Sequence, residues 1–216
     1  MKSKYDLILY DLDGTLIDSV PAIMNSFKMA YVKVLGRCDR SDEDLMSYIG
    51  KPLVESFKMH DEETAKKLFD TYLDINCGML RDDMVEMFPN VMDGIIKLNS
   101  MGVKQGVVTS KKFESADITM KLKGLYEFMT CNVFNEDTAI HKPEAEPLLC
   151  AAAKAGVEDM SRVLYVGDAL ADGLCAKNAG ADFALVDWSM MDKSDILNQS
   201  GGTTIKSIEE IVHLIY

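Results

Sequence analysis

Hydrophobic and polar positions follow two patterns along this chain, one typical of buried strands and the other of amphipathic helices. Short, uninterrupted apolar runs predict five strands, at residues 7–10, 103–108, 131–134, 163–166 and 183–186. Apolar residues at helical spacing predict helices between and after these strands, at residues 91–101, 114–122, 147–155, 169–179 and 207–215. The repeated alternation of strand and helix predicts an α/β fold with a parallel sheet, right-handed crossovers and helices on both faces.

Residues 17–83 follow a different pattern, because helical spacing dominates and no convincing strand is found between Leu16 and Phe88. Helices are expected at residues 20–35, 41–49 and 61–80, and Gly50-Lys51-Pro52 ends the second of them. An all-helical insert of this size directly after a first strand predicts a separate helical cap over the carboxyl edge of the sheet. We therefore expect a core of residues 1–16 and 84–216 and a cap of residues 17–83.

Two aspartates stand where the first strand ends. Asp11 and Asp13 lie two residues apart, which places both side chains on the same side of an extended chain, and Gly14 permits the sharp turn that follows. The carboxyl edge of such a sheet is where ligands bind, and two adjacent carboxylates there require a divalent cation or a shared proton. Ordinary turn chemistry would also explain an isolated Asp-Gly pair.

Three more polar clusters follow core strands, so the topology brings them to the same edge. Thr109-Ser110 can hold phosphate oxygens with hydroxyl and backbone N–H groups, although a simple helix cap is the commoner role of such a pair. Lys142 offers a positive charge before a rigid proline, or is simply a solvated side chain. Asp168 and Asp172 fall on one helix face, where acids also favour a helix N-terminus.

The order and spacing of these clusters are more specific than any one of them. Asp11-Leu-Asp13-Gly-Thr15 comes first, Thr-Ser follows about a hundred residues later, then Lys-Pro, and finally Gly-Asp-x-x-x-Asp before Lys-Asn-Ala-Gly. This series resembles all four motifs of the haloacid dehalogenase superfamily, and most of all its phosphoglycolate phosphatase group with a small helical cap. Ala145 departs from that pattern where a second proline is common, and Ser189 where glycine is common. Neither departure is expected to touch the chemistry.

The resemblance implies a Rossmann-like catalytic core and a Mg²⁺-dependent phosphatase, classed as a phosphoric monoester hydrolase. Its substrate would be a small phosphorylated metabolite, such as phosphoglycolate or pyrophosphate. Asp11 would be the nucleophile that forms an aspartyl-phosphate, and Asp13 the general acid and base. The implied metal ligands are Asp11, the Asp13 backbone carbonyl and Asp168, with Asp172 in or just behind that shell. The implied phosphate-binding residues are Thr15, Thr109, Ser110 and Lys142.

Alternative functions can be weighed from single residues. The dehalogenase branch lacks an acid at the position of Asp13, so Asp13 favours phosphoryl transfer. A sugar phosphomutase of the same superfamily would have a histidine twelve residues after the nucleophile, where this chain has Ile23. A non-catalytic phosphate-binding module would have lost one of the catalytic carboxylates or Lys142, and all are present. Lys51 either contacts the anionic tail of a substrate or is a solvated lysine in a turn.

Charge and cysteine content narrow the expected partners. The 216-residue chain has a formal net charge of -12, which argues against nucleic acid and anionic membranes as partners. Its five scattered cysteines are best explained as free thiols in a reducing compartment. There is no apolar run of membrane-spanning length and no expected cleavable signal. We expect a cytoplasmic protein that works as a monomer or, alternatively, as a dimer.

Overall fold

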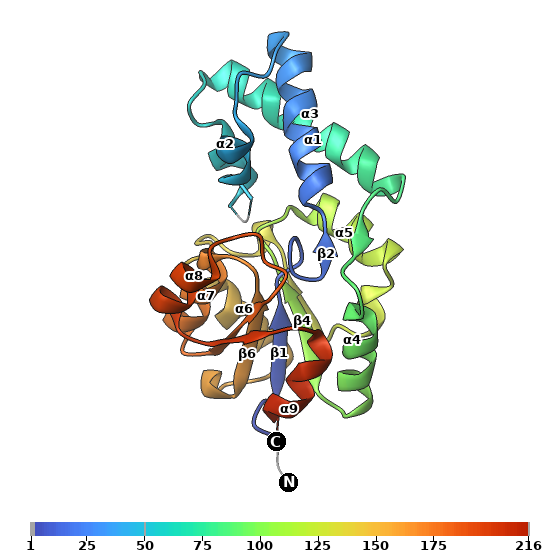
Figure 1. The fold of residues 1–216 in the computed structure, drawn as a ribbon, viewed down its shortest axis with the longest axis vertical. Helices are drawn as coiled ribbons and strands as arrows, with labels where there is room; N and C mark the ends of the chain where they lie inside the picture. Colours follow the sequence, from blue (N-terminus) through green and yellow to red (C-terminus); the bar gives the residue numbers. More distant parts are fainter. Residues whose placement is uncertain (1–2, 50, 216) are drawn as a thin grey trace.

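The computed structural model describes residues 3–49 and 51–215, and a six-stranded sheet lies at its centre in the order β5-β4-β1-β6-β7-β8 (Figure 1). Every neighbouring pair in this sheet is parallel. The strands are β1 (Leu7–Tyr10), β4 (Lys104–Val108), β5 (Cys131–Val133), β6 (Val163–Gly167), β7 (Asp182–Val186) and β8 (Thr203–Ile205). The predicted α/β fold with a parallel sheet is thus confirmed.

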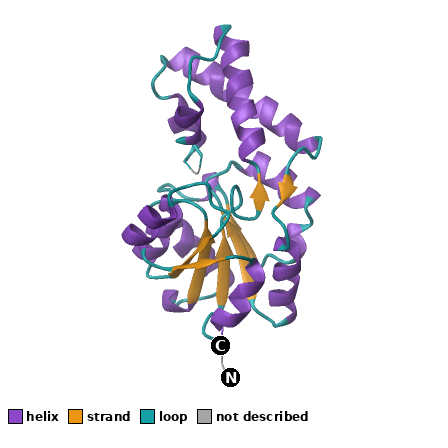
Figure 2. Cartoon of the chain, in the orientation of Figure 1, coloured by secondary structure: helices purple, strands orange, loops and turns teal. Residues whose placement is uncertain are grey.

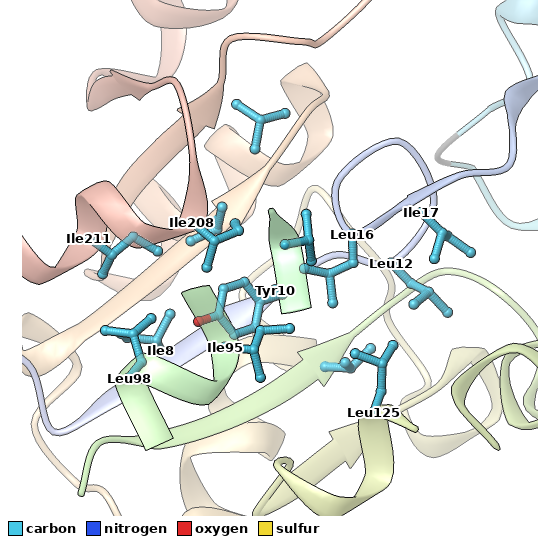
Figure 3. Close-up of a cluster of buried hydrophobic side chains, with 14 of the residues drawn as sticks. Ile8, Tyr10, Leu12, Leu16, Ile17, Ile95, Leu98, Leu125, Ile208 and Ile211 are labelled. Carbon is cyan, nitrogen blue, oxygen red and sulfur yellow. The ribbon is translucent and has the colours of Figure 1, made fainter. Parts of the chain in front are cut away.

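The first strand is buried on both of its faces, as its unbroken apolar sequence predicted. Ile8 and Tyr10 pack into one hydrophobic cluster, shown in Figure 3, while Leu7 and Leu9 pack into the cluster on the opposite face. The core helices that contribute to the first cluster are α4 (Val91–Ser100), α5 (Phe113–Leu122) and α9 (Ile211–Ile215), and the cap adds Ala22 and Leu80 to it. Those that contribute to the second are α6 (Glu146–Ala155), α7 (Leu170–Ala179) and α8 (Lys193–Ser200). Both faces of the sheet are therefore covered by helices.

The cap consists of helices and loops beyond the carboxyl edge of the sheet (Figure 2). Its elements are α1 (Val20–Leu35), α2 (Asp42–Met46), the 3-10 helix η1 (Leu53–Phe57) and α3 (Glu62–Arg81). Phe27, Tyr31 and Leu68 belong to a hydrophobic cluster that these elements form among themselves. Helix α1 ends at Leu35, as predicted, and Gly36 caps it in the left-handed conformation. Gly50, which was expected to help end the second helix, lies outside the described residues.

Two short strands join the cap to the core, and the prediction of no strand between Leu16 and Phe88 was wrong. Strand β2 (Ile17–Asp18) pairs antiparallel with β3 (Glu86–Met87), so the two chain crossings lie side by side. Two residues per strand are too few for any periodic pattern to be visible in the sequence. The same applies to the three-residue strand β8, which was also missed together with helix α8.

The remaining elements are short 3-10 helices in the connections of the core. They are η2 (Leu125–Glu127), η3 (Asn135–Asp137), η4 (Met160–Arg162) and η5 (Ile208–Glu210). None of the helices in residues 3–49 and 51–215 combines the length and the apolar character needed to cross a membrane.

Candidate active site

The carboxyl ends of β1, β4 and β6 bring the predicted residues to one edge of the sheet. A pocket lies between this edge and the cap, and both parts of the chain line it. Asp11, Asp13, Thr109 and Ser110 line it from the core, together with Lys111 and Lys112. The cap contributes Ile23, Lys51, Ser56, Tyr72 and Asn76, among others. The pocket is therefore lined both by the sheet edge and by the helical insert.

The turn after β1 depends on Gly14. Its φ of 80° lies in the left-handed region, and a Cβ added there would stand 2.4 Å from Asp168 Oδ2. Both the backbone conformation and the close approach of Asp168 therefore require glycine. Thr15 then donates its hydroxyl hydrogen to Asp168 Oδ1 at 3.1 Å. The turn thus brings the β1 aspartates next to Asp168.

Lys142 is buried and holds the Asp11 carboxylate. Its Nζ donates to Asp11 Oδ1 at 2.9 Å, to Asp172 Oδ1 at 2.7 Å and to the Tyr165 hydroxyl at 3.1 Å. An ammonium group has three N–H donors, so these contacts use all of them. Lys142 therefore acts on Asp11 directly in this structure, and its contact with a phosphoryl group stays a prediction. Tyr165, which the sequence presented only as a core strand residue, is part of this arrangement.

Asp172 supports two parts of the site from behind. Its Oδ2 accepts from the backbone N–H groups of Asp168 and Ala169, at 3.2 and 3.1 Å. Its Oδ1 accepts from Lys142, as described above, and from the Tyr165 hydroxyl at 3.1 Å. A Cβ at position 167 would collide with Asp172 at 2.5 Å, which explains the glycine before Asp168. Asp172 thus fixes both the lysine and the loop that presents Asp168.

Burial and mutual repulsion change the protonation of the carboxyl groups in this cluster. Burial raises the pKa of Asp11 to about 7, against the opposing charge of Lys142. Burial, followed by the charges of Asp172 and Asp11, also raises the pKa of Asp168 well above its ordinary value. Burial opposes the charge on Lys142, but the two carboxylates that it contacts raise its pKa above the ordinary value.

The charges of this cluster and the distances between its oxygen atoms both fit a site for a divalent metal ion. Asp11, Asp168 and Asp172 each offer an oxygen within 4.8 Å of the others. When all three carboxyl groups are ionised, they leave two negative charges beyond the one that Lys142 balances, which a hard divalent cation would neutralise. The Asp13 carboxylate does not belong to this cluster, and the Asp13 backbone carbonyl as a metal ligand stays a prediction.

Asp13 is instead paired with a lysine that sequence reasoning missed. Lys111 Nζ donates to both carboxylate oxygens of Asp13, at 2.8 and 3.1 Å. Both side chains are largely buried at the pocket wall. The available signal was position, because Lys111 directly follows Thr109-Ser110 at the end of β4. The pair places a positive charge beside the expected general acid.

Two hydroxyl residues at the end of β4 face the same pocket. Thr109 is buried and accepts the N–H of Lys111 on its Oγ1 at 3.2 Å, which shapes the loop. The Ser110 Oγ is buried without a hydrogen-bond partner among the described residues. A buried hydroxyl without a partner is costly, so this atom is available to a ligand oxygen.

The segment after β7 contacts the site from the other side. Trp188 Nε1 donates to the Thr15 carbonyl at 3.2 Å, and its ring lies 5.5 Å from that of Phe88 at the cap-core junction. The Ser189 hydroxyl donates to the Asp168 carbonyl at 2.6 Å. Ser189 therefore fixes the backbone of a candidate metal ligand, while the expectation that it does not touch the chemistry stays a prediction.

Comparison with known proteins agrees with this geometry. The family model described as haloacid dehalogenase-like hydrolase matches residues 8–186, which include most of the sheet, the cap and the residues that line the pocket. The chain belongs to the haloacid dehalogenase-like hydrolases. The resemblance inferred from the motifs is thus confirmed.

Individual relatives can be aligned with this chain over most of its length. It is 40% identical over 174 residues to "Putative pyrophosphatase PpaX" of Clostridium perfringens, covering 81% of this chain and 80% of that protein. It is 29% identical to pyrophosphatase PpaX of Oceanobacillus iheyensis, over 96% of this chain and 95% of the relative. Among solved structures, a "Putative haloacid dehalogenase-like hydrolase" from Bacteroides fragilis has a TM-score of 0.86 at 24% identity, covering 96% and 100% of the two chains. That likeness shows the shared fold.

Proposed function

We propose that this chain is a Mg²⁺-dependent phosphatase that hydrolyses a small phosphorylated metabolite through an aspartyl-phosphate on Asp11. The observation that carries the proposal is the buried Asp11 side chain, which lines the pocket, contacts Lys142 and lies in a cluster with Asp168 and Asp172. The substrate would be pyrophosphate or a phosphoglycolate-like monoester. Two names support this range, namely the pyrophosphatase relatives and a solved structure from Lactobacillus plantarum described as a putative phosphoglycolate phosphatase.

The residues divide the reaction into two displacements. An Asp11 oxygen attacks phosphorus while the bond to the leaving oxygen breaks, and Asp13 supplies a proton to that oxygen. Water, deprotonated by Asp13, then attacks the same phosphorus and restores Asp11. Thr109 and Ser110 would contact the phosphoryl oxygens from the end of β4.

Mg²⁺ would be held by Asp11 and Asp168, with Asp172 beside them. When bound, it neutralises charge on the nucleophile and on the phosphoryl oxygens. Lys142 keeps the Asp11 carboxylate oriented throughout, because it is fixed in turn by Asp172 and Tyr165. Closure of the cap would exclude bulk water from the acyl-phosphate.

The alternative functions find less support in the pocket. Ile23 lines it at the position where a phosphomutase would have a histidine, and an aliphatic side chain cannot relay a proton. A non-catalytic binding module would not need the nucleophile, the acid and the lysine together. Both alternatives predict no net release of inorganic phosphate.

We also propose that the protein acts in the cytoplasm as a monomer, without nucleic acid or membrane partners. The net charge of -12 supports the absence of nucleic acid and membrane partners, because it repels polyanions and anionic lipid surfaces. Light scattering of the purified chain checks the monomer.

The test is release of inorganic phosphate from a panel of phosphomonoesters and pyrophosphate. Wild-type protein with Mg²⁺ is expected to turn over at least one member, and excess chelator is expected to stop it. Asp11→Asn should fold with an unchanged circular dichroism spectrum and lose turnover, because an amide is a poor nucleophile. Full turnover in chelator, or by Asp11→Asn, would remove the proposal.

A further inference from the structure

The pocket wall next to Asp13 gathers positive charge in a strongly acidic chain. Lys51, Lys111 and Lys112 all line the pocket, although the chain has a formal net charge of -12. Lys112 already has other partners, since it lies 3.6 Å from Glu136 Oε1 and 5.1 Å from the centre of the Phe69 ring. Lys111 contacts Asp13, whereas Lys51 is exposed and has no carboxylate within ion-pair distance among the described residues. Lys111 uses two of its three N–H donors on Asp13, so one donor of Lys111 and the ammonium group of Lys51 can meet an anion in the pocket.

The cap adds an unpartnered donor to the same pocket. Ser56 in η1 is 1% exposed, and its Oγ has no hydrogen-bond partner among residues 3–49 and 51–215. It lines the pocket together with Lys51. Leaving a buried hydroxyl unpaired costs free energy, so a ligand oxygen that accepts from Ser56 would recover it.

We propose that Lys111, Lys51 and Ser56 form a distal anion subsite that binds the second phosphoryl group of pyrophosphate. The inference rests on the proposed function and narrows its substrate to a phosphoric anhydride in preference to monoesters with neutral tails. Lys111 is the specificity-determining residue of the core, and Lys51 and Ser56 are those of the cap.

The contact between Lys111 and Asp13 places this subsite on the leaving-group side of the reaction. As Asp11 bonds to the transferred phosphorus, the bond from that phosphorus to the bridging oxygen breaks, and the oxygen retains the electron pair. Asp13, which has to be protonated in the reacting state, gives that oxygen its proton, and the distal phosphoryl group leaves as inorganic phosphate. Lys111, 2.8 Å from Asp13, lies where this leaving phosphate gains charge. Water then hydrolyses the aspartyl-phosphate and releases the transferred phosphoryl group as inorganic phosphate.

The first test compares pyrophosphate with p-nitrophenyl phosphate, whose leaving group has a neutral aromatic body. Lys111→Met and Lys51→Met should each lower the ratio of kcat/KM for pyrophosphate to kcat/KM for p-nitrophenyl phosphate by about 10- to 100-fold, as expected for a lost charged hydrogen bond. Ser56→Ala should lower the ratio less. Lys66→Met is the matched control, since it removes the same charge from an exposed cap lysine paired with Asp70. That control should leave the ratio unchanged.

A binding measurement separates this inference from the proposed function. Calorimetry should show that wild-type protein with Mg²⁺ binds imidodiphosphate more tightly than inorganic phosphate, and that Lys111→Met or Lys51→Met reduces this preference about tenfold or more. If the protein shows no turnover but its preference for imidodiphosphate over inorganic phosphate depends on these lysines, the phosphatase proposal would be refuted and the subsite would be supported. The subsite would be refuted if Lys111→Met and Lys51→Met both left the ratio of kcat/KM values unchanged. If the protein shows no turnover, an unchanged binding preference in both variants would refute it.

Discussion

At the scale of single residues, Gly14 meets a conformational and a steric requirement together. Its φ of 80° disfavours any side chain, and the space that a Cβ would need is occupied by the Asp168 carboxylate. Gly36 has nearly the same φ, 79°, but nothing lies within 4 Å of a Cβ added there. A comparison of substitutions at these two positions therefore distinguishes the cost of backbone strain from the cost of disturbing the site.

Gly14→Ala should lower activity by about 10²-fold or more, because displaced reacting groups cost rates of this order. Gly36→Ala should retain activity and lose only about 1–2 kcal/mol of unfolding free energy, the cost of a left-handed residue with a side chain. Urea unfolding and phosphate release on both variants check this. Equal activities in the two variants would show that the contact between position 14 and Asp168 does not matter.

The sequence predicted the residues that belong to short local motifs. Asp11, Asp13 and Asp168 follow buried strands, and parallel topology brings such strand ends to one edge. Lys111 and Tyr165 were not recognised, because their roles come from contacts across 98 and 23 residues of sequence. Nothing local distinguishes a tyrosine that orients a lysine from one that only packs in a strand.

At the scale of elements, the cap packs around its own apolar residues. Leu68 of α3 is fully buried in the cap cluster, together with residues of α1, α2 and η1. The chain enters and leaves this unit through the β2-β3 pair. The predicted division into core and cap, with limits at residues 17 and 83, stays a prediction that a cap mutation can test.

Leu68→Ala should destabilise the cap by about 2–5 kcal/mol through the cavity it leaves. Hydrogen exchange is expected to accelerate in α1 and α3 while β1 and β6 remain protected. Ile95→Ala in α4, a comparable buried deletion in the core cluster, should give the reverse pattern. Equal acceleration throughout the chain in Leu68→Ala would mean that cap and core unfold as one unit.

Elements were predictable where a pattern had enough length to show. Helices α1 and α3 have 16 and 20 residues, clear end signals and one apolar face, and both agree with the prediction. Helix α8 has a polar sequence with Ile196 as its one buried residue, so its amphipathic signal is weak. Strands β2 and β3 depend on pairing with each other across the cap, which no local window contains.

At the scale of the whole molecule, the protonation of the site carboxyl groups affects the free energy of unfolding. The pKa of Asp11, raised by burial to about 7, means that the metal-free folded state retains a proton that the unfolded state releases near its ordinary value of 3.8. This contribution favours the folded state at low pH and is lost as pH rises from about 4 to about 7. A bound divalent cation would replace that proton.

Mg²⁺ should therefore raise the melting temperature more at about pH 8 than at about pH 5. At a hundred times its dissociation constant the shift at the higher pH would be about 5–10 °C for a chain of this size. Differential scanning calorimetry with and without Mg²⁺ measures it, and Asp168→Asn serves as the control with a reduced shift. A shift of the same size at both values of pH would argue against displacement of protons at this cluster.

The central claim is that Asp11 accepts the phosphoryl group, and the most direct measurement is to trap that intermediate. Protein quenched in acid during turnover with Mg²⁺, then digested and examined by mass spectrometry, should have one phosphoryl group on the peptide that contains Asp11. The label should be lost on treatment with hydroxylamine, which cleaves acyl-phosphates, and should be absent from Asp11→Asn. A phosphoryl group on another residue, or phosphate release by Asp11→Asn at the wild-type rate, would contradict the account.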